Sequence, residues 1–188
     1  MTESDLDEDN LHMVKVINQS GNRLLNTLNL ILNLSRVEAN SRNIKLSRFN
    51  LNQLIAHSVT LFQSVASQKG LELIVNYSPS LVDIESDNNL VEHIVNELIN
   101  NAVKYSNSGI VLVSTKIEND SFVIIVVQDN GIGIPKELLH IIFDAFRQAS
   151  EGWDRTFEGS GLGLTICKKY ATLLGGKIAV ESEMEKGK

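Results

Sequence analysis

The sequence has little cysteine, no run of basic residues and no long apolar segment. Its single cysteine, Cys167, excludes an internal disulfide and any zinc site built from several cysteines, as expected in a reducing compartment. The formal net charge of −6 and the lack of a lysine or arginine run make nucleic acid a poorly supported partner. No apolar run is long enough to span a bilayer, and the acidic residues 1–10 form neither a secretory signal nor an anchor.

The scarcity of aromatic residues shapes the expected core. They make up 5% of the 188 residues, while hydrophobic residues as a whole make up 43%, so leucine, isoleucine and valine must fill most of the core. Such a core suits helices layered on a sheet, with Cys167 as one more small core residue. The length supports one main domain with a smaller appendage.

A long helix is predicted close to the N-terminus. Positions spaced alternately three and four apart form its seam, namely Val14, Ile17, Gly21, Leu24, Leu28, Ile31 and Ser35. Leu25 and Leu32 widen this face beyond what one neighbouring helix covers, so another segment or chain is expected to complete a bundle. Residues 40–43 interrupt the pattern as a connector, which divides the chain into residues 1–43 and residues 44–188.

The second part is predicted to alternate strands and helices. Asn50 and Asp87 are good N-caps for two helices, the first ended by Gly70, and residues 162–174 form a third helix closed by Gly175-Gly176. Strands are expected at residues 46–49, 71–77, 110–117, 122–128 and 177–182, with a hairpin turn at residues 118–121. These elements predict an α+β class, a two-layer α/β sandwich of a mixed sheet and three helices, preceded by one long bundle helix.

Three clusters of residues in this second part are candidates for chemistry. On the helix after Asp87, four polar residues follow one another at steps of four, four and three and therefore share one face: His93, Glu97, Asn101 and Lys104. A polar helix face is usually solvated surface, and this is the favoured interpretation when the cluster is taken alone.

The other two clusters are rich in glycine. Residues 129–135, Asp-Asn-Gly-Ile-Gly-Ile-Pro, follow a strand, and their glycines would let the backbone approach a ligand. Asp129 could accept a hydrogen bond from an amino group there, although a plain turn is the simpler interpretation. Residues 159–164, Gly-Ser-Gly-Leu-Gly-Leu, enter a helix N-terminus that favours phosphate, and a flexible loop explains them equally well. A dinucleotide fingerprint is disfavoured because polar residues 150–158 precede them instead of a buried strand.

In this order, and with Phe143-Asp144-Ala145-Phe146 between the last two, the clusters resemble the N, G1, F and G2 boxes of histidine kinases with the Bergerat ATPase fold. Asn101-Ala102-Val103-Lys104-Tyr105 is similar to the N box, residues 129–135 to the G1 box and residues 159–164 to the G2 box. Within the first helix, Arg23-Leu24-Leu25 and residues 34–39 look like the second helix of the dimerisation and phosphoacceptor hairpin. The chain thus resembles the catalytic ATP-binding domain of a sensor histidine kinase.

The resemblance implies a two-component kinase that binds ATP and Mg²⁺ and transfers the γ-phosphate to a histidine. It implies that Asp129 holds the adenine amino group, that Asn101 coordinates Mg²⁺ and that Lys104 neutralises phosphate. The other implied nucleotide-binding residues are Tyr105, Gly131, Gly133, Ile134, Phe146, Gly159, Ser160, Gly161, Leu162, Gly163 and Leu164. A mobile lid is expected over residues 143–160, in which Arg147 and Arg155 could add positive charge but are more simply solvated.

The sequence departs from the family pattern in two places. Glu97 stands where many of these kinases have asparagine, and a carboxylate there could act as a general base, orient the attacking imidazole or bind Mg²⁺ through water. No histidine stands in an acceptor motif, so each is interpreted as structural or solvated: His12, His57, His93 and His140. The acceptor helix is therefore expected to precede this chain, and a closing strand to follow it.

The implied partners are ATP, a response regulator or receiver domain, and a second copy of the intact kinase in a homodimer. The chain is expected to be cytoplasmic and to make no membrane contact of its own, with a membrane tether elsewhere in the intact protein left open. Two other functions stay open. One is an ATP-hydrolysing conformational clamp of the gyrase or chaperone type, favoured by Glu97, and the other is a non-catalytic nucleotide-binding scaffold, favoured by the missing acceptor histidine.

Overall fold

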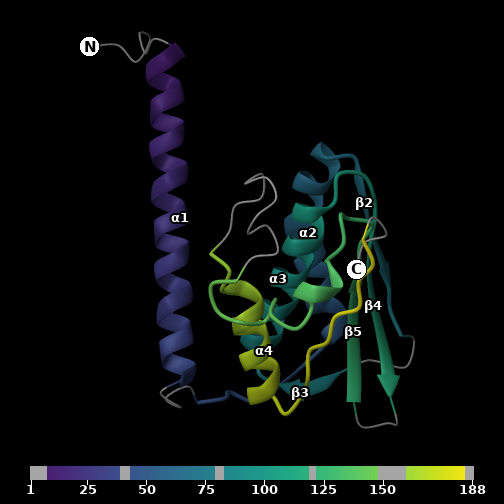
Figure 1. Ribbon diagram of the computed structural model, residues 1–188. Coiled ribbons are helices and arrows are strands. Elements are labelled where there is room, and N and C mark those ends of the chain that lie inside the picture. Colours follow the sequence, from purple (N-terminus) through teal and green to yellow (C-terminus); the bar gives the residue numbers. More distant parts are fainter. Residues whose placement is uncertain (1–7, 39–42, 79–82, 119–121, 148–159, 185–188) are drawn as a thin grey trace. The chain divides into compact units, whose positions relative to one another are not determined.

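The computed structural model describes residues 8–38, 43–78, 83–118, 122–147 and 160–184 (Figure 1). The chain divides into two compact units, Met1–Arg42 and Asn43–Lys188. Most of the predicted connector and of the predicted hairpin turn lies outside the described residues.

The described part of the first unit is one helix, α1 (Glu8–Glu38), of 31 residues. The predicted long helix is therefore present. Its seam is exposed, with 40% to 70% of the surface accessible at Val14, Ile17, Leu24, Leu28 and Ile31. An apolar stripe of this kind is typical of a helix that packs on another helix. Neither α1 nor any other helix in the described part of the chain combines the length and apolar character needed to cross a membrane.

The second unit contains two sheets. Three strands, β2 (Leu71–Asn76), β4 (Gly109–Glu118) and β5 (Phe122–Gln128), lie in the order β2-β4-β5. β2 runs parallel to β4, and β4 runs antiparallel to β5, so the sheet is mixed, as predicted. Two short strands, β1 (Ser47–Phe49) and β3 (Ile84–Ser86), form a separate antiparallel pair.

The described part of this unit has three α-helices, α2 (Leu51–Gln68), α3 (Asn88–Tyr105) and α4 (Gly163–Leu173) (Figure 1). α2 and α3 form the core with the larger sheet, and α4 packs on α3. α3 contacts both α2 and α4, and also contacts β4 and β5. The apolar side chains that are fully buried between helices and sheet include Leu51, Ile55, Val95, Ile99, Val111 and Val113. Burying each such side chain stabilises the fold by roughly 1.5–3 kcal/mol. The predicted two-layer α/β sandwich with three helices is confirmed.

The first two of these helices begin at their predicted capping residues. Asn50 Oδ1 accepts a hydrogen bond of 2.9 Å from the Gln53 amide, and Asp87 Oδ1 accepts one of 3.2 Å from the Leu90 amide. Asp87 Oδ2 also accepts a hydrogen bond of 2.9 Å from the Lys45 amide. One buried carboxylate thus fixes both the start of α3 and the segment that leads into β1.

The β4–β5 hairpin returns the chain to the place where β4 begins. Leu112 pairs with Gln128 in the antiparallel register, and the Ile110 amide donates a hydrogen bond of 3.1 Å to Asn130 Oδ1. The residues after β5 therefore lie beside the segment that follows the end of α3.

One strand prediction is wrong. Within the described residues, residues 177–182 belong to no strand, and the larger sheet ends at β5. A strand requires main-chain hydrogen bonds to a neighbouring strand, which an apolar alternation alone does not supply. At the end of this segment, the Ile134 amide donates a hydrogen bond of 2.8 Å to Ser182 Oγ, and the next residue, Glu183, forms only an isolated β-bridge. The sequence pattern also misses β3 and a single 3-10 turn, η1 (Lys136–Leu138), since three residues show no periodicity.

Candidate functional site

The polar face predicted on α3 has members that contact one another. Asn101 Nδ2 donates a hydrogen bond of 3.1 Å to Glu97 Oε1, one helical turn before it. Lys104 Nζ donates a hydrogen bond of 3.1 Å to the Tyr105 hydroxyl and lies 4.7 Å from the centre of that ring. These four side chains are half-buried. The face is therefore not simply solvated surface.

The Glu97 carboxylate lies where α3 meets the first turn of α4. A Cβ atom placed on Gly163 would collide with Glu97 Oε1, so the N-terminus of α4 packs directly on the carboxylate. Burial raises the pKa of Glu97, and the Asn101 hydrogen bond and the charge of Lys104 act in the opposite direction. One turn further along α4, burial and then the charge of Glu97 raise the pKa of the Cys167 thiol.

A second buried carboxylate follows β5. Asp129 is 3% exposed, and its Oδ1 accepts a hydrogen bond of 2.8 Å from the Gly131 amide. A Cβ atom on Gly131 would lie 2.6 Å from the Tyr105 carbonyl oxygen and 2.7 Å from Asp129 Oδ1, so only glycine fits. The Ile132 amide donates a hydrogen bond of 3.3 Å to the same Tyr105 carbonyl. The loop after β5 is thereby joined to the last turn of α3.

The same loop then packs against the C-terminal segment. Gly133 has a φ of 73°, and a Cβ atom there would collide with the Glu183 carbonyl. Ile134 is 5% exposed. The two predicted loop positions thus have different surroundings, since Gly131 contacts α3 whereas Gly133 contacts the C-terminal segment.

The third cluster is described from Ser160 onward. Gly161 has a φ of 68°, and a Cβ atom there would lie 2.8 Å from the Arg147 carbonyl oxygen. The Gly161 carbonyl accepts a hydrogen bond of 3.0 Å from the Phe146 amide, which joins the two ends of the predicted lid. Leu162 is fully buried, and its amide donates to Ser160 Oγ at 3.3 Å. Gly159, Arg155 and the rest of residues 148–159 lie outside the described residues.

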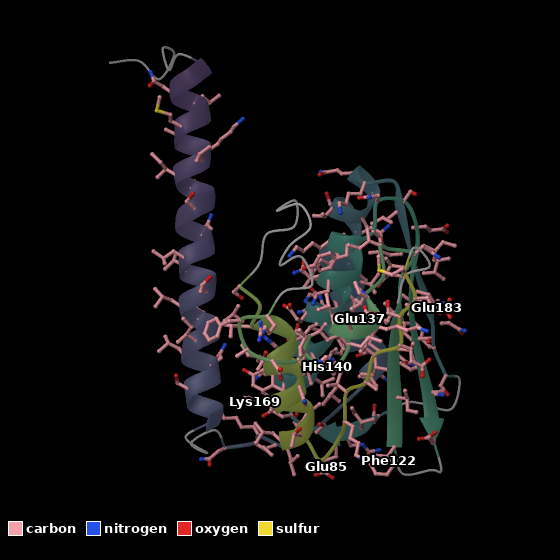
Figure 2. All side chains as sticks on the ribbon, viewed as in Figure 1. Glu85, Phe122, Glu137, His140, Lys169 and Glu183 are labelled. Atoms are coloured by element: carbon pink, nitrogen blue, oxygen red, sulfur yellow. The ribbon has the colours of Figure 1, made fainter. Side chains whose placement is uncertain are left out.

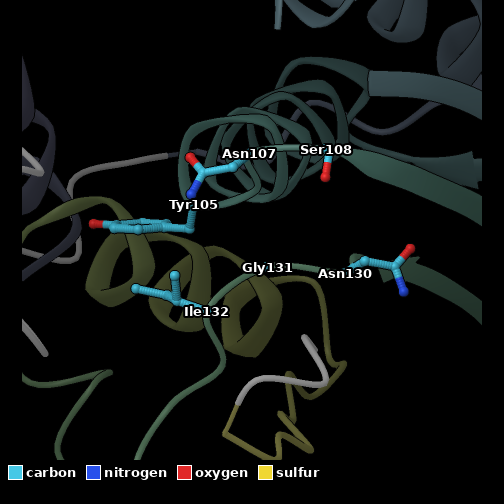
Figure 3. A pocket seen from close by; sticks show the side chains of 6 residues that line it. All are labelled: Tyr105, Asn107, Ser108, Asn130, Gly131 and Ile132. Carbon is cyan, nitrogen blue, oxygen red and sulfur yellow. The ribbon is translucent and has the colours of Figure 1, made fainter. Parts of the chain in front are cut away.

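A pocket of about 170 Å³ opens between the end of α3 and the loop after β5. It is lined by Tyr105, Asn107, Ser108, Asn130, Gly131 and Ile132. Figure 3 shows Tyr105, Asn107 and Ile132 on one side of the pocket and Ser108 and Asn130 on the other. Sequence analysis misses Asn107 and Ser108, because short polar residues after a helix are equally typical of any loop, whereas Asn130 lies within the predicted cluster of residues 129–135.

Ser106 is a further residue that sequence analysis misses. It is fully buried, and its Oγ finds no hydrogen-bond partner within the described part of the chain. This hydroxyl lies 3.1 Å from the position that a Cβ atom of Gly131 would take, and Asp129 Oδ1 lies 2.7 Å from the same position. Buried hydroxyl groups are nearly always hydrogen-bonded, so the site has polar capacity left for a ligand or water.

All three clusters meet along α3. Gly131 packs on Tyr105 at the helix end, and Gly163 packs on Glu97 eight residues earlier. At a rise of 1.5 Å per residue, these two positions are about 12 Å apart along the helix. Asn101 and Lys104 lie between them. The arrangement is an elongated site with a buried carboxylate at one end and the N-terminus of an 11-residue helix at the other.

Oxygen atoms on α3 fit a hard divalent cation such as Mg²⁺. The Asn101 amide nitrogen donates to Glu97, which leaves the Asn101 amide oxygen as an acceptor beside a carboxylate. Among the described residues, no group of three or more histidine, cysteine, aspartate or glutamate side chains could hold a metal ion by itself. A cation here therefore needs further oxygen ligands from a bound phosphate compound or water.

The three histidines whose side chains the structure describes, His57, His93 and His140, lie as structural or solvated residues do. His140, labelled in Figure 2, and His57 are exposed, and His57 Nε2 lies 4.0 Å from a Glu92 carboxylate oxygen. The His93 ring packs edge-on against Tyr170, with 5.1 Å between the ring centres. The His12 side chain lies outside the described residues.

The family described as histidine kinase-, DNA gyrase B- and HSP90-like ATPases matches residues 86–188, just over half of the chain. The autoinducer 2 sensor kinase/phosphatase LuxQ of Vibrio cholerae is 36% identical over 182 residues, which cover 95% of this chain and 21% of LuxQ. The sensor histidine kinase RcsC of Escherichia coli is 30% identical over 172 residues, which cover 91% of this chain and 18% of RcsC. The chain thus spans about a fifth of the length of these relatives.

A solved structure shows the same fold over almost the whole chain. The crystal structure of full-length ShkA in complex with AMPPNP matches with a TM-score of 0.85 and 27% sequence identity. The match covers 98% of this chain and 38% of the ShkA chain.

Proposed function

Because this chain belongs to the family of histidine kinase-, DNA gyrase B- and HSP90-like ATPases, as a catalytic ATP-binding domain of the sensor histidine kinase type, we propose that it binds Mg-ATP and transfers the γ-phosphate to a histidine other than its own four. One observation carries this proposal. The three clusters meet along α3, with Gly131 against Tyr105 and Gly163 against Glu97.

The end of the site at Asp129 suits the adenine. Asp129 is buried at the end of β5, and a carboxylate accepts hydrogen bonds strongly from an amino group in such a setting. Gly131 lets the loop that carries Asp129 pack directly on the Tyr105 carbonyl, beside the pocket that Tyr105 and Ile132 line, and a flat ring could enter that pocket. We assign the adenine to Asp129, Gly131 and Tyr105, with Ser106 Oγ as a further polar contact.

The end of the site at α4 suits the phosphates. The first N–H groups of α4 have no partner within the helix, and the helix dipole favours negative charge at this end. Gly161 and Gly163 keep the backbone bare of side chains, and Lys104 adds a positive charge from α3. The remaining predicted residues are assigned to the walls of the nucleotide site and to the base of the predicted lid: Ile134, Phe146, Ser160, Leu162 and Leu164.

Asn101 is the proposed protein ligand of Mg²⁺, and Glu97 is the residue that orients it. The hydrogen bond from Asn101 Nδ2 to Glu97 Oε1 fixes which end of the amide faces the carboxylate. When bound, Mg²⁺ neutralises charge on the phosphate oxygens and aligns them for transfer. Glu97 is hydrogen-bonded to Asn101, and Lys104 is hydrogen-bonded to Tyr105. In the kinase reaction, Glu97 therefore positions the Mg²⁺ ligand and Lys104 contributes its positive charge.

The chemical step exchanges one bond to phosphorus for another. The bond between the γ-phosphorus and the oxygen that bridges it to the β-phosphate breaks, while a bond from the γ-phosphorus to an imidazole nitrogen forms. The chain's own groups hold the triphosphate and offset its charge during this exchange. The imidazole is proposed to come from outside this chain, because none of its four histidines stands in an acceptor motif.

The proposed partners follow from this activity. The phosphorylated histidine is proposed to pass its phosphoryl group to a response regulator or receiver domain. The exposed apolar seam of α1 supports a homodimer of the intact kinase, in which another helix covers that seam. The acidic chain is proposed to bind no nucleic acid and to work in the cytoplasm, where ATP is available.

Calorimetric titration with ATP, with and without Mg²⁺, tests the proposal. Asp129→Asn should abolish measurable binding under both conditions, because the amide presents a donor to the adenine amino group. Asn101→Ala should weaken binding mainly when Mg²⁺ is present. Asn100→Ala, an exposed neighbour on the same helix, is the matched control and should bind like the wild type. A wild-type chain that binds no ATP, or an Asp129→Asn chain that binds it normally, would contradict the assignment.

An ATP-hydrolysing clamp is the second candidate, and Glu97 is the observation that favours it. Its pKa is raised by burial, and it sits against the helix N-terminus proposed for the phosphates, where a general base for water could act. Steady ATP hydrolysis by the isolated chain that Glu97→Gln abolishes would favour the clamp. Phosphate transfer in trans to a chain that supplies an acceptor helix, without such hydrolysis, would favour the kinase and exclude a non-catalytic scaffold.

A further inference from the structure

The last turn of α3 has its carbonyl groups held from outside the helix. Lys69 Nζ donates hydrogen bonds of 2.7, 2.9 and 3.1 Å to the carbonyl oxygens of Val103, Lys104 and Ser106. The Tyr105 carbonyl, between them, accepts from the Ile132 amide. Helix C-termini normally leave such carbonyls to water, so this end of α3 is unusually well anchored.

Lys69 reaches this place because of where α2 ends. It is the C-cap residue of α2, and the following Gly70 has a φ of 70°, which turns the chain into β2. An ammonium group has three N–H donors, and here it meets three carbonyl acceptors at the negative end of a helix dipole. Burial lowers the pKa of Lys69, so the three carbonyls replace hydration that the half-buried ammonium has lost.

We infer that Lys69 is a positioning residue for the nucleotide site. This inference rests on the proposed function, and it depends on a continuous path of contacts from Lys69 to the loop after β5. Lys69 holds the carbonyl of Lys104, the next carbonyl along the chain holds the Ile132 amide, and Gly131 packs against that same carbonyl. Without the ammonium, the last turn of α3 frays, and the loop that carries Asp129 loses its fixed distance from Lys104 and Tyr105.

A purely structural role makes a different prediction. If Lys69 only stabilises the fold, any change on α2 with the same loss of stability should have the same effect on the site. Asn50→Ala is the matched control, because it removes the N-cap hydrogen bond to the Gln53 amide at the opposite end of α2.

The experiment compares Lys69→Met, Lys69→Arg and Asn50→Ala in this chain. Amide hydrogen exchange at Ile132 and Ser106 reports on the anchored turn, calorimetry with Mg-ATP reports on affinity, and urea unfolding reports on stability. Lys69→Met should speed exchange at both amides and weaken ATP binding, each by about tenfold. Lys69→Arg, which keeps the charge and several donors, should restore affinity to within about threefold of wild type. Asn50→Ala should change neither exchange at these amides nor affinity.

Several results would overturn the inference. One is unchanged exchange at Ile132 in Lys69→Met, and another is faster exchange with unchanged ATP affinity. A third is an Asn50→Ala variant that loses as much affinity as Lys69→Met. If Lys69→Met does not fold, Lys69→Gln, which keeps two N–H donors, takes its place. If the wild type binds no ATP, the proposed function fails, and exchange at Ile132 still decides whether Lys69 anchors the turn.

Discussion

Gly131 makes a tight contact with the backbone of α3, and Gly131→Ala tests it. The added Cβ atom would lie 2.6 Å from the Tyr105 carbonyl oxygen and 2.7 Å from Asp129 Oδ1. Ordinary contacts between carbon and oxygen are about 3.3 Å or longer, so the loop must move from the helix by about 0.7 Å. The nearest atom belongs to the backbone of an anchored turn, and therefore the loop has to give way.

The expected size of the effect follows from this displacement. Overpacking of a close contact costs typically about 1–3 kcal/mol of stability, and the Ile132 to Tyr105 hydrogen bond, already 3.3 Å long, should break. Asp129 then leaves its place beside Tyr105, so we expect ATP affinity to fall by more than about tenfold. Urea unfolding measures the first quantity and calorimetric titration with Mg-ATP the second.

The control for this substitution is Gly176→Ala. The nearest atom to a Cβ atom on Gly176 is the Ala171 carbonyl oxygen at 3.5 Å, an ordinary contact, so neither stability nor affinity should fall. The reasoning is refuted if Gly131→Ala unfolds and binds ATP like the wild type, or if the two alanine variants behave alike.

Three further predictions concern the carboxylates and the thiol. Because the pKa of Glu97 is raised, the native state binds the carboxyl proton of Glu97 more tightly than the unfolded chain does. The protonated carboxyl therefore contributes to stability below pH 4.5, and this contribution is lost as the pH rises through the raised pKa. Glu97→Gln should therefore gain stability relative to wild type between pH 4.5 and pH 7.5 in urea unfolding, and parallel pH profiles would contradict this. Asp87→Ala, which loses the N-cap of α3 and the bond from Lys45, should lower the free energy of unfolding by about 1–2 kcal/mol, whereas the exposed Asn100→Ala should not. The Cys167 thiol, buried and beside Glu97, should resist a thiol reagent at pH 8 until urea unfolds the chain, and rapid labelling of the native protein would exclude this environment.

Local signals in the sequence account for most of the fold. Asn50 and Asp87 cap their helices through their own side chains within three residues, so the two starts are predictable without any tertiary information. The resemblance to sensor histidine kinases, drawn from the residues around Asn101, Asp129 and Gly161, is confirmed by the family match and by the structure of ShkA. The roles of individual residues toward ATP and Mg²⁺ remain predictions.

Features that depend on distant partners could not be predicted. Residues 177–182 alternate like a strand, but pairing with a neighbouring strand decides whether a strand forms, and these residues belong to no strand. Lys69 and Val103 are 34 residues apart, and a lysine before a glycine at a helix end gives no indication that it binds another helix. Ser106 looks like an ordinary residue after a helix, and only the packing of Gly131 shows that its hydroxyl belongs to the site.

The register of the antiparallel hairpin of β4 and β5 fixes the position of Asp129 relative to the end of α3. The chain leaves the end of α3, runs along β4 and returns along β5. The number of paired residues in the two strands therefore determines where Asp129 lies. Adding residues in matched pairs at the far tip would lengthen both arms equally and leave Asp129 where it is. Adding one residue to a single arm would turn every later side chain of that strand to the opposite face and carry Asp129 away from Tyr105. Insertions in relatives should therefore be frequent at the tip of this hairpin and absent from its arms.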